Sequence, residues 1–116
     1  MSDRLEFDGL SVAPNVIETI VRIASEQVEG VAAVGGTPIT GAAAVFKPRM
    51  PSIEVSAPEG EALEVAVYIT ADYGLNLPQL GAAVQASVLD ALASQLGVES
   101  ADVDVYIEAL DFKDKP

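Results

Sequence analysis

Two segments of the chain alternate apolar and polar residues with a period of two, which is the pattern of a strand that buries one face. In residues 62–71 the apolar positions are Leu63, Val65, Val67, Ile69 and Ala71. In residues 101–110 the positions predicted to face the core are Val103, Val105, Ile107 and Ala109, and those predicted to face away are Asp102, Asp104, Tyr106, Glu108 and Leu110. We therefore expect both segments to be half-buried strands.

Two other segments repeat apolar residues every three or four positions, which is the spacing of a helix with one buried side. The first spans about residues 13–28, where Pro14 suits the first turn and Gly30 a C-terminal stop. The second spans about residues 78–96, between Asn76, a favoured N-cap, and Gly97. The apolar stripes are Val16, Ile17, Ile20, Val21, Ile23, Ala24 and Val28 in the first helix, and Leu80, Val84, Val88, Ala91 and Leu92 in the second.

The shorter apolar runs complete the predicted fold. Residues 31–34 form a short strand, residues 53–55 pair with residues 62–71 as an antiparallel hairpin, and residues 5–10 form a short edge strand. The order of elements predicts an α+β two-layer sandwich, with two helices packed on one face of a mostly antiparallel sheet of three or four strands. Residues 1–116 would be a single domain, with its core at about 5–110, a mobile loop at about 35–51 and a frayed tail at 111–116.

The outward face of this sheet is the first candidate for a functional surface. It would carry Glu64, Tyr68, Thr70, Asp104, Tyr106 and Glu108. An acidic face with two tyrosines can receive a partner, and it can equally be the solvated side of an antiparallel sheet. From this face, Tyr68, Thr70, Tyr106 and Glu108 are the candidate interaction residues.

Two further segments carry candidate contacts. The second helix has a single charged residue, Asp90, so Ala82, Ala86 and Leu89 lie where water-facing charge is normally found. This composition is explained either by helix propensity or by a covering partner. Within the loop, Phe46, Lys47 and Arg49 either form a docking site for an acidic partner, or Phe46 packs on the core and the two bases balance local charge.

The charge of the chain limits the classes of partner. Its 116 residues include 18 acidic and 6 basic side chains, for a formal net charge of −12. Nucleic-acid binding requires a basic surface, and anionic lipids repel an acidic one, so we expect neither nucleic acid nor direct membrane insertion. No apolar run reaches the length of a membrane span and no signal-peptide pattern begins the chain, which predicts a cytoplasmic protein.

The residue types needed for most enzyme chemistry are missing. The sequence has no His and no Cys, which removes the usual general base, the thiol nucleophile and the common zinc ligands. The glycines match no phosphate-binding pattern, and the acidic pairs match no calcium loop. We therefore assign no catalytic, cofactor-binding or metal-binding residue. The polar turn at Asp72, Tyr73 and Asn76 leaves an alternative, which is a small-molecule or ion-binding regulatory domain.

Three blocks in order resemble the family named after alkaline shock protein 23 and the general stress protein Gls24. The first is Val16–Val31, which ends in Val-Glu-Gly-Val; the second is Val67–Pro78, with Tyr-Gly-Leu-Asn-Leu-Pro; the third is Leu96–Glu108, with Val-Asp-Val-Tyr-Ile. The resemblance spans about residues 5–110. The chain departs from the family at residues 35–50, where Lys47-Pro-Arg replaces a Gly-Arg-Lys-like segment, and it lacks the family's longer charged tails.

This resemblance implies a non-enzymatic cytoplasmic protein of Gram-positive bacteria that acts in envelope stress and cell-envelope homeostasis. Some members of the family self-associate and are held at the membrane by a separate anchored protein. The resemblance thus implies a protein-interaction or scaffold module that forms a homo-oligomer or docks on a membrane-anchored partner, peripheral at the inner face of the membrane. The family has no established catalytic residues, so none is carried over.

Overall fold

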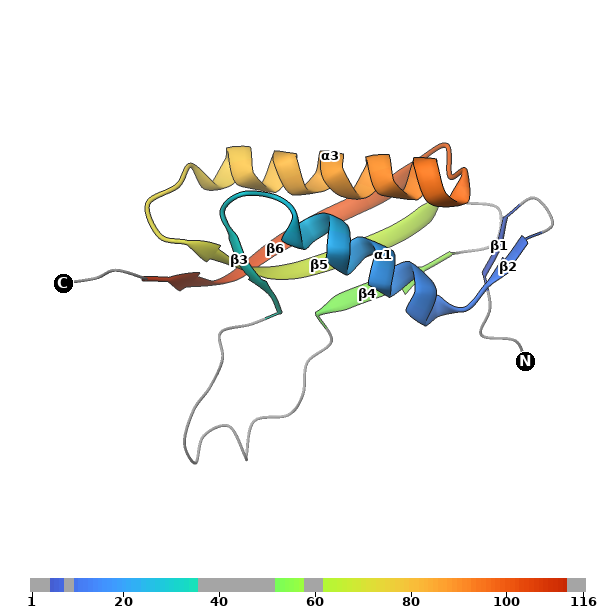
Figure 1. The fold of residues 1–116 in the computed structure, drawn as a ribbon, viewed down its shortest axis with the longest axis horizontal. Coiled ribbons are helices and arrows are strands. Elements are labelled where there is room, and N and C mark those ends of the chain that lie inside the picture. The colour runs from blue at the N-terminus through green and yellow to red at the C-terminus, as the bar shows by residue number, and fades with distance from the viewer. Residues whose placement is uncertain (1–4, 8–9, 36–51, 58–61, 113–116) are drawn as a thin grey trace, which may run out of the picture.

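The fold is α+β, as expected (Figure 1). The computed structural model describes residues 5–7, 10–35, 52–57 and 62–112. Within these residues the helices are α1 (Pro14–Glu26) and α3 (Leu77–Leu96). Its strands are β1 (Leu5–Phe7), β2 (Leu10–Val12), β3 (Val31–Val34), β4 (Ile53–Ser56), β5 (Leu63–Asp72) and β6 (Ala101–Asp111).

β5 is the central strand of the main sheet. β6 pairs with it in parallel along its whole length, from Leu63↔Ala101 to Asp72↔Asp111. β4 and β3 pair with it antiparallel, β4 along its first half and β3 along its second half. The two short strands meet at Tyr68, whose N–H donates to the Ser52 carbonyl at 2.9 Å and whose carbonyl accepts from the Gly35 N–H at 2.6 Å. The sheet is therefore mixed but mostly antiparallel, as predicted.

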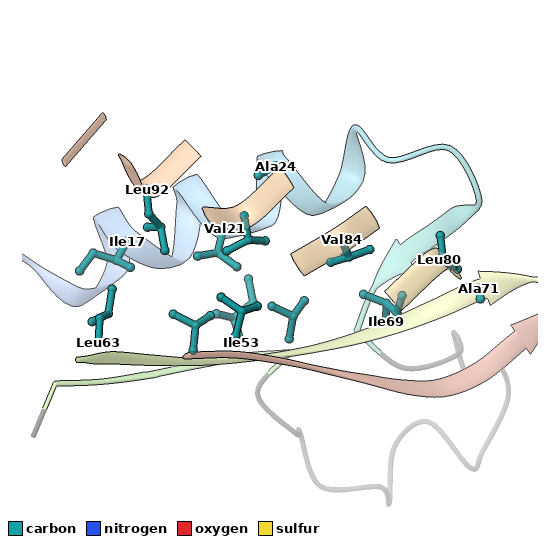
Figure 2. Packing of buried hydrophobic residues seen from close by; sticks show 14 of the residues in the cluster. Ile17, Val21, Ala24, Ile53, Leu63, Ile69, Ala71, Leu80, Val84 and Leu92 are labelled. Carbon is teal, nitrogen blue, oxygen red and sulfur yellow. The ribbon is translucent and has the colours of Figure 1, made fainter. Parts of the chain in front are cut away.

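Both helices pack on one face of this sheet and enclose an aliphatic core between the two layers (Figure 2). The strands contribute Val12, Ile53, Leu63, Val65, Val67, Ile69, Ala71 and Val103, and the helices contribute Ile17, Val21, Ala24, Leu80, Val84, Val88 and Leu92. The helices are also joined to each other, because the Ser87 hydroxyl donates to the Ala24 carbonyl at 2.7 Å.

Local chemistry fixes the ends of α3. The side-chain oxygen of Asn76 accepts from the backbone N–H of Gln79 at 3.0 Å, which confirms the predicted cap. At the other end Gly97 adopts a left-handed conformation with φ of 70°, which favours glycine. α1 begins at Pro14 without a side-chain cap and ends at Glu26, two residues short of the prediction.

The prediction of one short edge strand at residues 5–10 was wrong. β1 and β2 pair antiparallel with each other, as a separate two-stranded sheet. The register places Leu5 opposite Val12 and Phe7 opposite Leu10. Asp-Gly between two short alternating segments is a hairpin signal that the prediction overlooked.

The end of β6 also differs from its predicted pattern. The register with β5 shifts between Ile69 and Thr70, so Ile107 pairs with Ile69 while Ala109 pairs with Thr70. Glu108 is the extra residue of this β-bulge, which reverses the alternation that follows it. Leu110, predicted to face away, therefore packs against the core, and the strand continues to Asp111.

Candidate protein-interaction face

The face of the main sheet opposite the helices forms the candidate site, which we call the open face (Figure 2). Neither α1 nor α3 covers it. The strand registers arrange its side chains in rows, with Ser56, Glu64 and Asp102 in one row, and Glu54, Ala66 and Asp104 in the next. The row after these holds Tyr68 and Tyr106 as direct neighbours.

The two tyrosine rings are stacked. Their centroids lie 4.8 Å apart with an interplanar angle of 15°. This separation matches the spacing of about 4.8 Å between neighbouring strands, so the rings stand side by side on β5 and β6. Tyr106 has 45% of its surface exposed, and Tyr68 is half-buried. The pair is therefore an ordered aromatic surface that is accessible from solvent.

The hydroxyl of Tyr68 lies among carboxylates. It donates to Oε1 of Glu54 at 3.4 Å. Partial desolvation raises the pKa of Tyr68 above its usual value, and the charges of Glu54 and Glu108 raise that pKa further, together with Tyr106. The negative form of the hydroxyl is thus disfavoured, so Tyr68 remains a neutral donor at neutral pH.

The charge around the pair has one sign. Glu54, Glu64, Asp102, Asp104 and Glu108 are all exposed. Within the described ranges the only basic residue is Arg22, which extends from α1 to donate to the Ser52 hydroxyl at 3.0 Å. No group of described residues has the arrangement of a metal site. The open face is therefore an anionic surface with no cation of its own among these residues.

A hollow of about 640 Å³ lies at the edge of the open face. The acidic residues Glu54, Glu64, Asp102 and Asp104 line it, and α3 adds Gln85 and Leu89. The side-chain amide of Gln85 donates to the carbonyl of Val103 on β6 at 2.9 Å. This bond occupies one backbone acceptor of β6 on the side next to α3.

The other predicted contact residues differ in their exposure to solvent. Thr70 lies on the same strand as Tyr68 but is only 2% exposed, and its hydroxyl donates to the Gly35 carbonyl at 3.0 Å. Its prediction as a surface contact was therefore wrong, because the end of β3 takes up its polar group. Glu108 remains exposed at the bulge. Ala82, Ala86 and Leu89 are exposed on α3. Phe46, Lys47 and Arg49 lie outside the described residues.

The residues of the polar turn after β5 have structural roles. Asn76 caps α3, and Gly74 turns the chain with φ of 100°. The backbone N–H of Asp72 donates to the Gly30 carbonyl at 2.8 Å. Tyr73 lies against Phe112, with ring centroids 4.6 Å apart.

The contact with Phe112 was missed because the sequence suggested a frayed tail from residue 111. Beyond the bulge, β6 pairs with β5 as far as Asp72↔Asp111, and the Tyr73 N–H donates to the Asp111 carbonyl at 3.0 Å.

Comparisons with known proteins agree with the architecture. Residues 4–112 match the model of the family named after alkaline shock protein 23. That family is described as having a cell envelope-related function. The uncharacterized protein YqhY of Bacillus subtilis (strain 168) is 26% identical over 108 residues, which cover 91% of this chain and 79% of YqhY.

Two solved structures share the fold. The copper form of the MamM CTD is 20% identical, with a TM-score of 0.52, over 89% of this chain and 92% of that one. The W247A variant of the MamM CTD is 18% identical, with a TM-score of 0.54, over 88% of this chain and 86% of that one. At these identities the likeness concerns the fold alone. Among the described residues, neither helix is long and apolar enough to span a bilayer.

Proposed function

Because the chain belongs to the family named after alkaline shock protein 23, whose function is related to the cell envelope, we propose that it acts there as a non-enzymatic protein-interaction module. In this proposal it is a cytoplasmic scaffold that self-associates or docks on a membrane-anchored partner. It would reach the inner face of the membrane through that partner and not by inserting itself. The proposal extends to the response to envelope stress.

One observation carries this proposal, which is the open face with its stacked Tyr68 and Tyr106. Tyrosine is enriched at protein interfaces, because it buries a large area at a low entropic cost and keeps a polar group. A surface that neither α1 nor α3 covers, with ordered aromatic rings, has the composition of a binding site for another protein.

A non-enzymatic role is supported by the chemistry of the chain. The sequence has no His and no Cys, and no group of described residues could hold a metal, so the open face lacks the imidazole, thiol and metal centres that most enzymes use. The alternative of an ion- or small-molecule-binding regulator at the polar turn is less well supported, since Asn76 and Gly74 already have structural roles there.

Cell fractionation tests the proposal. The tagged protein is produced in Bacillus subtilis, and its share in the sedimented membranes is measured after chemical cross-linking. We expect the wild-type chain to sediment with the membranes, and the double substitution Tyr68→Glu/Tyr106→Glu to remain soluble. Tyr73→Glu is the matched control, because Tyr73 is also exposed, at 58%, but lies beyond the end of β5.

The control should sediment like the wild type. A second pair, Tyr68→Phe/Tyr106→Ser, guards against misfolding, since it avoids a charge beside the half-buried ring; thermal melts confirm that each variant is folded. A wild-type chain found wholly in the soluble fraction, or a folded double variant that still sediments, would overturn the role of this face at the envelope.

A further inference from the structure

We propose that the open face binds an arginine-bearing segment of another protein, with a guanidinium group stacked on Tyr106 and paired with the carboxylates that flank it. This inference rests on the proposed function and specifies the chemistry of the partner. It follows from three features of the described residues, which are the exposed ring, the surrounding charge, and the hydrogen bond and β-bulge that interrupt β6.

The first feature is the free side of the aromatic pair. In a stack each ring has one side turned to its neighbour and one turned away. Since β6 is the outermost strand beside β5, the free side of Tyr106 faces away from the sheet, and this ring is 45% exposed. The corresponding side of Tyr68 is turned toward β4, where its hydroxyl contacts Glu54. Tyr106 therefore offers a ring face to a cation.

The second feature is the position of the carboxylates. Asp104 lies two residues before Tyr106 on the same strand, about 6.6 Å along it, and Glu108 follows at the bulge. The charge of Glu108 acts on the Tyr68 hydroxyl, as does that of Glu54, so both acids lie close to the pair. A planar guanidinium can stack on a ring and donate to a carboxylate at the same time, which a lysine ammonium does less well.

The third feature argues against an added strand. An extended partner could pair with β6, but one backbone acceptor of this strand, the Val103 carbonyl, already accepts from the Gln85 amide at 2.9 Å. The bulge at Glu108 interrupts the same strand further along. The partner is thus expected to bind through side chains laid on the open face.

The charge of the chain argues against a second copy on this face. Each copy has a formal charge of −12 and five exposed acids on its open face. Two such faces placed together would bring like charges into contact, which opposes association. A cationic partner turns the same charges into an attraction.

Titration with defined peptides tests the inference. The probe is the fluorescent peptide Gly-Arg-Thr-Arg-Thr-Arg-Gly, compared with the same peptide carrying Lys or neutral citrulline in place of Arg. Binding is followed by polarisation and by NMR shifts of the backbone amides. We expect the Arg peptide to bind roughly two- to fivefold more tightly than the Lys peptide, the range of a cation–π contact, and the citrulline peptide not to bind. The shifts should centre on Tyr68, Asp104 and Tyr106.

Two variants separate local recognition from overall charge. Asp104→Asn/Glu108→Gln should weaken binding about tenfold and reduce its salt dependence, whereas Glu26→Gln/Glu29→Gln, which removes two exposed acids from the α1 region, should change it less than twofold. Tyr106→Leu should remove the preference for Arg over Lys. Equal binding of the two cationic peptides, or equal losses in the two double variants, would overturn the inference, because net charge alone would then explain the data.

The two sets of experiments distinguish a failure of this inference from a failure of the proposed function. If the tyrosine variants lose membrane sedimentation while no Arg peptide binds, the proposed interaction function is retained and the inference of an arginine-bearing partner is rejected. If the free protein dimerises and Tyr68→Glu/Tyr106→Glu abolishes the dimer, the occupant is a second copy and the inference is wrong.

Discussion

At the scale of single residues, Tyr68 contributes its backbone to the hydrogen bonding of the sheet and its side chain to the open face. Its backbone is bonded to both Ser52 and Gly35, at the point where β4 and β3 meet. Its ring stacks on Tyr106, and its hydroxyl reaches Glu54. The backbone bonds leave the ring little freedom to move along the strand, so Tyr106 has an ordered neighbour.

The titration of Tyr68 should report this environment. Desolvation and the nearby carboxylates raise its pKa in the folded chain, so between the ordinary value of about 10 and the raised value the folded state binds more protons than the unfolded state. Stability should therefore be constant below that range and fall as pH rises through it. NMR titration of the ring carbons should show the raised pKa, and Glu54→Gln should lower it, while Glu26→Gln should leave it unchanged. A lower pKa in the wild type than in Glu54→Gln would contradict this assignment.

Gly30 is a second residue whose identity the fold requires. It has φ of 106°, and a Cβ there would lie 2.6 Å from the Cδ1 of Leu75 and 3.2 Å from the Cδ1 of Leu80. Gly30→Ala should lower the free energy of unfolding by about 2 kcal/mol, from backbone strain and crowding together. Gly97→Ala is the matched control, because its φ is 70° and nothing lies within 4 Å, so it should cost about 1 kcal/mol. Urea denaturation measures both, and equal losses would show that crowding at Leu75 adds nothing.

At the scale of elements, α3 holds β6 beside β5. The crossover from β5 through α3 makes the parallel pair that brings Tyr68 and Tyr106 together, although they are distant in sequence. Beyond apolar packing, the bond from Gln85 to Val103 fixes the position of β6 under the helix. The open face therefore depends on a helix that lies on the opposite side of the sheet.

Removing this bond should loosen β6. Gln85→Ala should lower the free energy of unfolding by about 1 kcal/mol, the usual net contribution of one hydrogen bond. Hydrogen exchange at residues 101–107 should quicken more than exchange at β4. Gln95→Ala, at an exposed position near the end of the same helix, is the control and should change neither quantity. Unchanged exchange in β6 of Gln85→Ala would mean that apolar packing alone holds the strand.

The elements show what the sequence can and cannot predict. The period-two and helical patterns located β5, β6 and both helices within a few residues, because burial of one face leaves a regular trace. The β-bulge at Glu108 could not be recognised in the sequence, because Val-Tyr-Ile-Glu-Ala-Leu continues the alternation of apolar and polar residues while the pairing with β5 shifts. The pairing of Tyr68 with Tyr106 is a matter of register between distant strands, which periodicity does not contain. The hydrogen bond of the buried Thr70 is made to Gly35, which follows β3 and is distant in the sequence.

At the scale of the whole molecule, the net charge of −12 opposes the compact state. Folding gathers like charges, and among the described residues only Arg22 offsets them. The charge supports solubility, and in our proposal it also selects a cationic partner. Salt screens both the repulsion that opposes folding and the attraction to a cationic partner. Stability of the free protein should therefore rise with salt while binding of the partner weakens, which allows the two effects to be separated.

Added salt should stabilise the free protein. Between about 0.01 and 1 M NaCl the Debye length falls from about 30 to about 3 Å, so repulsion among the acids is screened. The midpoint of thermal unfolding should rise by a few degrees, roughly equivalent to 1 kcal/mol for a domain of this size. Sorbitol at equal osmolality is the control for excluded-volume effects. A midpoint that falls with salt would show that attractive ion pairs outweigh the repulsion.

The stacked rings have one more consequence, which concerns how the molecule can be observed. The sequence contains no Trp and only three Tyr, and two of those three lie 4.8 Å apart and nearly parallel. Coupling between their transitions should give the near-ultraviolet circular dichroism spectrum an exciton signature. That signal would disappear when β6 separates from β5 and change when a group is laid on Tyr106. The chain thus contains its own label-free optical probe at the surface where we expect a partner to bind.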